Sequence, residues 1–425
     1  MDYVTRATGD PLLALADWLQ GENPSGLLLV NFDLDCWWQD PTVKQGLLAI
    51  YYRDDGGLYC AVTEEALQFD AASASEQVNQ WAANHQLAFF RPGQPLQLSP
   101  VNIGKPWGRE VWFTGVEARG LSCFHDGHGK APIPWVQAIM PGALAGAPGR
   151  PLILLKILDP FPEEVRGDLY FELHQEKREV YVVTHVDKTA WPDGSGGIRF
   201  GFDPVKLGQA ADESSFRQDY LAAVQDYETV RRQIDALPAG VQPEPELVSR
   251  ERALRAKMNE FTHLRELRVG DVVVVPLLVP HSLQHGVRTI EFQTPVYERQ
   301  ILSFAQQVVT QAHWDTATAV GMMRLQPPPE QPFAQLQAEV GVTIERIVDF
   351  PDFEVRRIRI KPGRNHVLRL DHCYGLVMVV KGELTMNSLN LGTEEAAFLP
   401  AGSAVDLEPA RRDSGLVLLL AIPRG

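Results

Sequence analysis

The sequence predicts a mainly β protein with a helical insertion, preceded by an α/β domain. Short runs rich in β-branched residues, which are typical of strands, follow one another from Val101 to about Leu302 and again from Val342 to the end. Residues 208–267 interrupt the first series with Glu, Arg, Gln, Leu and Ala at helical spacing, which predicts two helices. Before residue 95, strand-like and helix-like segments alternate, which predicts the α/β domain.

These elements place three domains along the chain. Residues 1–95 are expected to form the N-terminal α/β domain, and no group of side chains in it indicates a chemistry. The Pro-rich segment 91–100 is expected to be a linker. Residues 96–325 are expected to form a β domain that contains the helical insertion. A second Pro-rich segment marks its end, and residues 326–425 are expected to form a C-terminal β domain.

Charge and cysteine usage limit the partners and the compartment. The 425 residues carry a formal net charge of −15, which argues against nucleic acid and anionic membrane surfaces but is compatible with an anionic small molecule. The four cysteines form no C-x-x-C pair, and no apolar run approaches the roughly 18 residues of a membrane span. A cytoplasmic protein is therefore expected. The oligomeric state is left open.

Two short motifs, far apart in the chain, indicate a metal site. The first has the spacing E-x-H-x4-E and consists of Glu172, His174 and Glu179. The second, G-x5-P-x4-H-x3-H, contains His281 and His285. Alternate residues of a strand point to the same side, so an imidazole from a later strand can meet the first motif inside a small barrel. Imidazole and carboxylate ligands with an open position suit a catalytic divalent metal, zinc most readily.

The paired motifs resemble the two-part signature of the cupin β-barrels, H-x-H-x4-E followed by G-x5-P-x-G-x2-H-x3-N. The C-terminal domain repeats this pattern without its chemistry, because Leu368, Leu370 and Val405 stand where the ligands would be. Apolar side chains cannot hold a metal. The resemblance therefore implies a bicupin, that is, two cupin-like barrels of which the second is metal-free.

The chain also resembles the zinc-dependent phosphomannose isomerases of type I, from about Asn102 to the C-terminus. The similar segments occur in the same order as in that family. They are 104–112 (W-G and G-E-x-W), 151–159 (F-P-L-L-x-K-x-L-D), 170–174 (S-I-Q-V-H), 177–179 (K-x-E), 275–281 (V-P-x-G-x-x-H), 286–291 (G-x-x-x-x-E) and 297–299 (T-Y-R).

This resemblance implies a metal and a set of site residues. One zinc ion per chain is expected in the first barrel. Its implied ligands are Glu172, in place of the family's Gln, together with His174, Glu179 and His281. The implied catalytic and substrate-binding groups are Lys156, Lys177, Glu291 and Arg299. Lys156 also lies in an otherwise apolar run, and a buried lysine needs a partner.

The reaction that the resemblance implies is the interconversion of mannose 6-phosphate and fructose 6-phosphate through a cis-enediol. Glu291 would move the proton between C1 and C2. Arg299 and Lys177 would stabilise negative charge on the sugar oxygens, and Lys156 and Arg299 would bind the phosphate of this phosphorylated hexose.

Three departures from the family motifs leave alternatives open. Tyr170, Gln175 and Leu278 stand where the family has Ser, Pro and Gly. The first alternative is a catalytically inactive or regulatory sugar-binding bicupin. The second is a metal-dependent cupin of other chemistry, such as a dioxygenase, which would prefer iron and a His-rich first motif. Metal content and an assay with mannose 6-phosphate discriminate among these functions.

Overall fold

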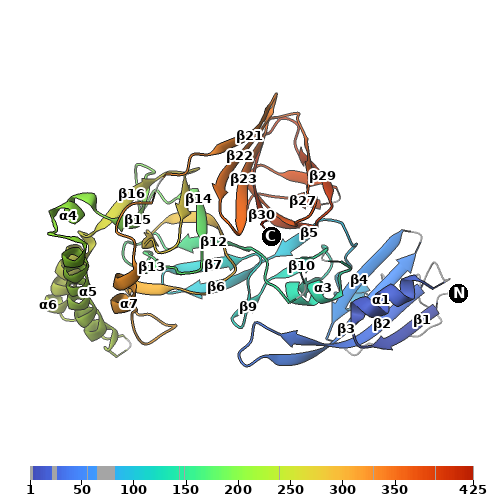
Figure 1. Cartoon of the computed structure of the whole chain (residues 1–425), viewed down its shortest axis with the longest axis horizontal. Helices are drawn as coiled ribbons and strands as arrows, with labels where there is room; N and C mark the ends of the chain where they lie inside the picture. The colour runs from blue at the N-terminus through green and yellow to red at the C-terminus, as the bar shows by residue number, and fades with distance from the viewer. Residues whose placement is uncertain are drawn as a thin grey trace. The chain divides into compact units, whose positions relative to one another are not determined.

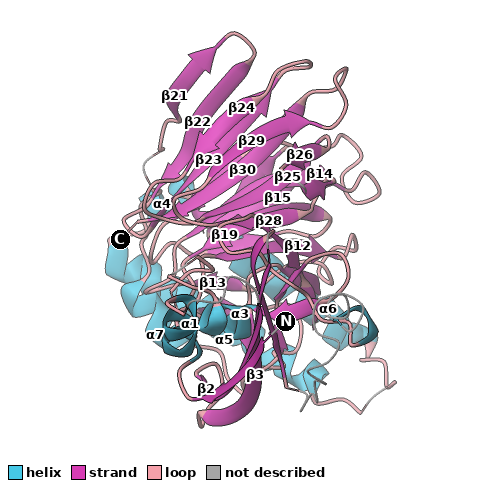
Figure 2. Ribbon diagram, turned by 90° about the vertical axis from the view of Figure 1, so that its right-hand side faces the viewer, coloured by secondary structure: helices cyan, strands magenta, loops and turns pink. Residues whose placement is uncertain are grey.

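The protein is mainly β with few helices, as the sequence predicts (Figures 1 and 2). It is known from a computed structural model, which describes residues 3–424 apart from 22–25, 55, 65–81, 143, 148, 239, 329 and 388. None of the helices described in these ranges is long and apolar enough to cross a membrane.

The chain divides into two compact units, each built from separate stretches of sequence. The first unit comprises Met1–Val101, Trp112–Leu155 and Phe333–Gly425. The second unit comprises Asn102–Val111 and Lys156–Pro332. The three domains expected from the sequence stay a prediction.

Two sheets enclose one core in the second unit. Buried side chains from both sheets, among them Tyr181, Ile198, Val273 and Leu283, form a single cluster between them. The larger sheet has the order β17 (Val272–Val275), β14 (Glu179–Val186), β19 (Val287–Gln293), β12 (Leu154–Pro160), β7 (Gly108–Trp112) and β6 (Val101–Lys105). The smaller sheet has the order β16 (Thr262–Leu267), β15 (Gly196–Phe202), β18 (His281–Leu283), β13 (Phe171–Leu173) and β20 (Gln300–Ser303).

Helices lie on the outer side of the smaller sheet. They are α4 (Pro204–Gln209), α5 (Glu213–Asp235), α6 (Pro245–Asn259) and α7 (Thr316–Met322). The two helices predicted for the insertion are α5 and α6, which lie alongside each other (Figure 1). The prediction of helix up to residue 267 is wrong, because 262–267 form β16, which pairs with β15.

The face of α5 that is buried explains how the insertion supports the sheet. Phe216 and Tyr220 of α5 pack against Phe202 of β15, with ring centroids 5.2 and 5.3 Å apart. Phe171 and Leu173 of β13 belong to the same buried cluster. The insertion therefore covers the face of β13 that carries Phe171 and Leu173. Glu172, which lies between them, faces the opposite side.

Among the described residues of the N-terminal part of the first unit, four strands form a sheet, and a helix lies against it. Its strands are β1 (Tyr3–Thr8), β2 (Gly26–Cys36), β3 (Val43–Asp54) and β4 (Gly57–Thr63), in that order. The helix α1 (Pro11–Leu19) begins at Asp10, whose carboxylate accepts hydrogen bonds from the first helical amides. The Tyr51 hydroxyl donates to the Ile139 carbonyl at the end of α3 (Ile133–Ile139).

A nine-stranded sheet joins distant parts of the chain within the first unit. Its order is β11 (Lys130–Pro132), β10 (Cys123–His125), β5 (Leu96–Ser99), β28 (Ala396–Leu399), β25 (Gly375–Lys381), β30 (Leu416–Pro423), β23 (Phe353–Ile360), β22 (Val342–Asp349) and β21 (Ala334–Glu339). The expectation of a linker over 91–100 is wrong in part, because β5 lies inside it. Leu96 and Leu98 are buried there, and Gln97 pairs with Ala397.

A four-stranded sheet completes this C-terminal β structure. Its order is β24 (His366–Arg369), β29 (Ala404–Pro409), β26 (Leu384–Met386) and β27 (Leu389–Leu391). Leu368 lies opposite Val405, and both belong with Leu370 to the apolar cluster between the two sheets. The three residues at the predicted ligand positions are therefore core side chains.

The described sheets are open rather than closed into barrels, including the short pair β8 (Val116–Glu117) and β9 (Gly120–Leu121). Each β structure holds its own apolar core between two sheets. The bicupin arrangement and the separate N-terminal α/β domain stay predictions.

Candidate metal centre

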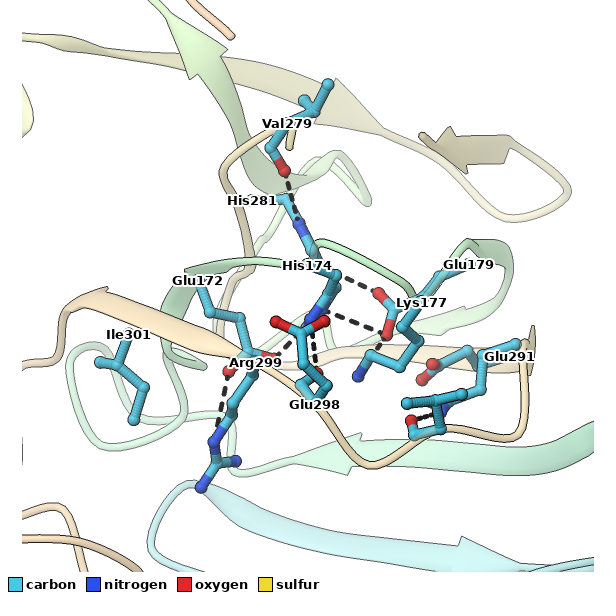
Figure 3. A network of polar contacts seen from close by, with 12 residues as sticks. Glu172, His174, Lys177, Glu179, Val279, His281, Glu291, Glu298, Arg299 and Ile301 are labelled. Carbon is cyan, nitrogen blue, oxygen red and sulfur yellow. Dashed lines mark hydrogen bonds and ion pairs between the residues drawn. The ribbon is translucent and has the colours of Figure 1, made fainter. Parts of the chain in front are cut away.

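Strand register brings the first motif and the second motif together. Glu172 on β13 lies opposite His281 on β18 in an antiparallel pair. Because Phe171 and Leu173 are buried beneath the helices, Glu172 faces the inner side of the sheet, and His174 follows on that side. The polar side chains gather there, as Figure 3 shows.

Glu179, the first residue of β14, reaches the same place from the larger sheet. Glu172, His174 and His281 each offer one ligand atom, and these atoms lie within 4.8 Å of one another. Nε2 of His281 lies 2.9 Å from one Glu179 carboxylate oxygen, and Nε2 of His174 lies 3.4 Å from the other. The structure thus groups the four residues that the sequence analysis names as ligands. Their role as ligands stays a prediction.

Backbone carbonyls orient both imidazole rings. Nδ1 of His174 lies 2.9 Å from the Glu298 carbonyl oxygen, and Nδ1 of His281 lies 3.0 Å from the Val279 carbonyl oxygen. A carbonyl oxygen only accepts, so each Nδ1 carries a hydrogen and donates it. Metal-binding histidines are usually held by such a hydrogen bond from the other ring nitrogen. In the neutral rings the Nε2 lone pairs then face the carboxylates and are available to a metal.

Several buried atoms of the group need a positive partner. In the described part of the chain, Nε2 of His174 and Oε2 of Glu172 have no hydrogen-bond partner. Nε2 of His281 and the Glu179 carboxylate would be two acceptors 2.9 Å apart unless a proton or a cation lies between them. A divalent ion satisfies all of these atoms, and two carboxylates balance its charge. The residues therefore fit a divalent metal.

The protonation states agree with metal binding. Burial, together with Lys177 and His281, holds the pKa of His174 well below its ordinary value. Burial alone would raise the pKa of Glu179, but Lys177 and the two imidazoles outweigh it and hold this pKa well below the ordinary value. A neutral imidazole and an ionised carboxylate are the forms that bind metals.

A row of alternating charges crosses the larger sheet beside this group. It occupies the neighbouring strands β19, β12, β7 and β6. Lys156 Nζ lies 3.2 Å from Glu291 and 3.8 Å from Glu110, and Lys105 Nζ lies 3.1 Å from Glu110. Burial would lower the pKa of Lys156, but Glu110 and Glu291 raise it above its usual value. Lys156 therefore keeps its charge between two carboxylates.

Glu291 is a strongly perturbed carboxyl group. Glu291 is 1% exposed. Among the described residues, no donor lies in hydrogen-bond geometry to either of its carboxylate oxygens. Burial raises the pKa of Glu291 well above its ordinary value, since Lys156 only partly offsets the burial and Glu179 adds to it. A buried carboxyl group with a raised pKa beside a candidate metal site is a typical proton-transfer group.

Lys177 and Arg299, the other two predicted site residues, lie beside the candidate metal ligands. Lys177 Nζ lies 2.8 Å from Glu179. The Arg299 guanidinium lies over the Tyr170 ring, 4.6 Å from its centroid, and its Nε lies 3.9 Å from Glu172. The Arg299 side chain is 23% exposed. The cationic residues named from the sequence are thus all in contact with the acidic ones, and their catalytic roles stay predictions.

Three contributors were not found by the sequence analysis. Glu298 acts through its backbone carbonyl, for which no sequence signal exists. Glu110 shares the buried face of β7 with Trp112, and a carboxylate on a buried face signals a buried partner. Tyr181 lies two residues after Glu179 and therefore on the same side of β14, and its hydroxyl donates to Glu179 over 2.6 Å.

Leu278 has a backbone conformation that is unusual for a leucine. Its φ is +67°, in the left-handed region that favours glycine, and its amide donates to the His174 carbonyl over 2.8 Å. A glycine would adopt this conformation without strain, and the cupin-like motif has Gly at this position. The Leu278 side chain packs on the cluster beneath α5, which offsets the cost of that φ, about 1–2 kcal/mol.

The Tyr181 hydroxyl is expected to tune metal affinity. Tyr181→Phe removes the hydrogen bond to Glu179 but leaves the buried ring in place, so metal affinity should fall by about tenfold or more with little change in fold. Competition with a chelating dye measures this. Tyr51→Phe is the matched control, because it removes a buried tyrosine hydrogen bond in the first unit. Equal metal affinity in the two variants would contradict the assignment.

No protein-family model matches the chain, and no characterised protein matches it by sequence. Solved structures match it in fold. The mannose 6-phosphate isomerase of Bacillus subtilis matches with a TM-score of 0.56 at 15% identity, covering 77% of this chain and 99% of that one. A zinc-bound mannose 6-phosphate isomerase matches with a TM-score of 0.56 at 12% identity, covering 78% and 100%. A variant of phosphomannose isomerase from Salmonella typhimurium matches with a TM-score of 0.55 at 13% identity, covering 78% and 100%. The chain therefore shares the fold of these proteins.

Proposed function

We propose that the protein is a metal-dependent aldose–ketose isomerase that interconverts mannose 6-phosphate and fructose 6-phosphate. The observation that carries the proposal is the buried Glu291 carboxyl group, paired with Lys156 beside two imidazoles and two carboxylates that fit a divalent metal. The fold shared with mannose 6-phosphate isomerases supports it.

The metal we propose is zinc, one ion per chain, held by Glu172, His174, Glu179 and His281. Two imidazoles with carboxylates are a ligand set that zinc accepts. When bound, the ion supplies Lewis acidity that polarises the sugar oxygens at C1 and C2. A carboxylate at position 172 adds a negative charge to the set, in place of the neutral amide of the family motif.

Glu291 is the proposed base. It removes the proton from C2 of the aldose, which leaves a cis-enediol, and it returns a proton to C1 to form the ketose. A proton moves from O2 to O1 in the same conversion. The raised pKa of Glu291 makes the carboxylate a stronger proton acceptor than an ordinary glutamate, and the Lys156 ammonium group, 3.2 Å away, supports its ionised form.

The cationic side chains are proposed to bind and stabilise the negatively charged groups of the substrate. Lys177 lies between the metal ligands and Glu291 (Figure 3), where it can stabilise charge that develops on the enediol oxygens. Arg299 is partly exposed; its guanidinium lies over the Tyr170 ring, donates to the Thr310 hydroxyl and lies 3.9 Å from Glu172, so a phosphate or an enediolate can replace these neutral or distant partners. We assign the phosphate to Arg299 rather than to Lys156, because Lys156 is held between Glu110 and Glu291.

The two β structures are proposed to be a functional and a structural copy of one cupin-like architecture. Each encloses its own apolar core between two sheets. In the C-terminal copy, Leu368, Leu370 and Val405 fill the place of ligands with core side chains.

Activity on mannose 6-phosphate tests the proposal. The purified full chain, supplied with zinc, is expected to form fructose 6-phosphate, followed by a coupled enzymatic assay, and to lose this activity on treatment with a chelator. Glucose 6-phosphate serves as the comparison substrate. Zinc-loaded protein that is inert on mannose 6-phosphate would exclude the isomerase and favour the sugar-binding alternative.

A further inference from the structure

Two neighbouring pockets lie at one end of the C-terminal β structure, where loops join its strands. Each has a volume of about 330 Å³, which is in the size range of small-molecule sites. Arg364 links the two pockets. It lines the second pocket, and its side chain lies against the Cα of Gly341, which lines the first. We call the two together the loop-end site.

Positive charge dominates the loop-end site. The cations that line it are Arg359, Lys361, Lys381, Arg364 and Arg412, against the carboxylates of Glu339 and Glu408. Five positive and two negative charges line the site, and Glu345, which pairs with Arg359, brings the local charge to +2, in a chain whose formal charge is −15. Such a local excess attracts anions selectively.

Most of these cations are not neutralised by the protein. Arg359 is paired with Glu345. Lys361, Lys381, Arg364 and Arg412 make no ion pair with any residue that the structure describes. Neighbouring unpaired cations repel one another, and an anionic ligand that contacts several of them at once relieves this repulsion.

The floor of the first pocket is apolar. The half-buried Val417 and the exposed Pro362 line it, whereas Ile360 and Leu416 point to the opposite face of the sheet, into the apolar core. Strand register fixes the rim, because Val417 on β30 lies opposite Arg359 on β23 and opposite Lys381 on β25. Two cationic side chains therefore flank an apolar strip. This combination favours a ligand that carries an apolar ring as well as negative charge.

We propose that the loop-end site binds a small organic polyanion with an apolar ring, of the class of nucleoside diphosphates. The ring would lie on the apolar floor of the first pocket, and the phosphates would contact the lysine and arginine side chains. The site belongs to the first unit, whereas the candidate metal centre belongs to the second. The proposal does not depend on the proposed isomerase activity.

Isothermal titration calorimetry of the full chain with ADP tests the proposal. Saturable binding is expected, with inorganic pyrophosphate binding more weakly because it has no ring. Lys361→Glu with Lys381→Glu should weaken ADP binding by about a hundredfold, roughly tenfold for each lost charged contact. Lys188→Glu, an exposed lysine of the second unit, is the matched control and should bind as the wild type does.

Three results would overturn the proposal. The first is no saturable ADP binding at millimolar concentration. The second is unchanged binding in the Lys361→Glu, Lys381→Glu variant. The third is binding that Arg299→Ala abolishes and the double variant does not, because this would place the phosphates beside the candidate metal centre. Pyrophosphate that binds as tightly as ADP would overturn the role of the apolar floor and reduce the site to phosphate recognition.

Discussion

His281→Ala is expected to remove most of the metal from the purified protein. The wild-type chain should carry about one divalent ion, which elemental analysis measures. His281 is 2% exposed, it offers one ligand atom to the group formed with Glu172 and His174, and its Nε2 lies 2.9 Å from Glu179. Losing one of four ligands leaves a site too open to hold the ion, so metal affinity should fall by at least about a hundredfold, more than for the loss of a supporting hydrogen bond.

The control for this variant is His313→Ala, because the His313 side chain is 71% exposed and its loss should not change metal content. The fold of His281→Ala can be checked by circular dichroism in the same samples. Full metal occupancy in His281→Ala, or a metal-free wild type purified without chelators, would contradict the proposed centre.

Glu291→Gln is expected to keep the fold and the metal but to lose turnover by roughly a hundredfold or more, the usual scale for a general base. The amide has nearly the same shape as the carboxyl group, so the buried position on β19 should tolerate it. It cannot accept the proton from C2. Steady-state kinetics with mannose 6-phosphate measures kcat, and elemental analysis verifies the metal.

Arg299→Ala separates substrate binding from proton transfer. It should raise KM as well as lower kcat, because the guanidinium is proposed to contact phosphate or enediolate charge.

Glu213→Gln, at an exposed position of α5, is the matched control for Glu291→Gln and should have wild-type kinetics. A Glu291→Gln variant as active as the wild type would leave the enzyme in place but assign the base to another group.

Local strand geometry explains why much of the candidate site could be predicted. Glu172 and His174 share a side of one strand because alternate residues of a strand do so, whatever surrounds them. The spacing to Glu179 and the second motif around His281 then carried enough information to name the group that the structure brings within contact distance. The helices α5 and α6 were likewise predicted from the helical spacing of their own residues.

Lys156, Glu291 and Arg299 were predicted as site residues from the family resemblance rather than from spacing. The structure puts Lys156 against Glu291 and Arg299 near Glu172. What surrounds them was not predictable from a motif. Glu110 and Lys105 extend the charge row from two further strands, and the order of those strands depends on how the whole sheet packs.

The sequence by itself determined the mainly β class and the two helices of the insertion, because these follow from periodicity over a few residues, and its two short motifs named the ligand candidates that the structure groups. The tertiary structure alone decided which carbonyls orient the two imidazoles, that residues 262–267 form a strand, and that β5 pairs with β28 some three hundred residues later in the chain. These features depend on the register between distant strands, and that register is set by the packing of whole apolar faces, which no short segment encodes.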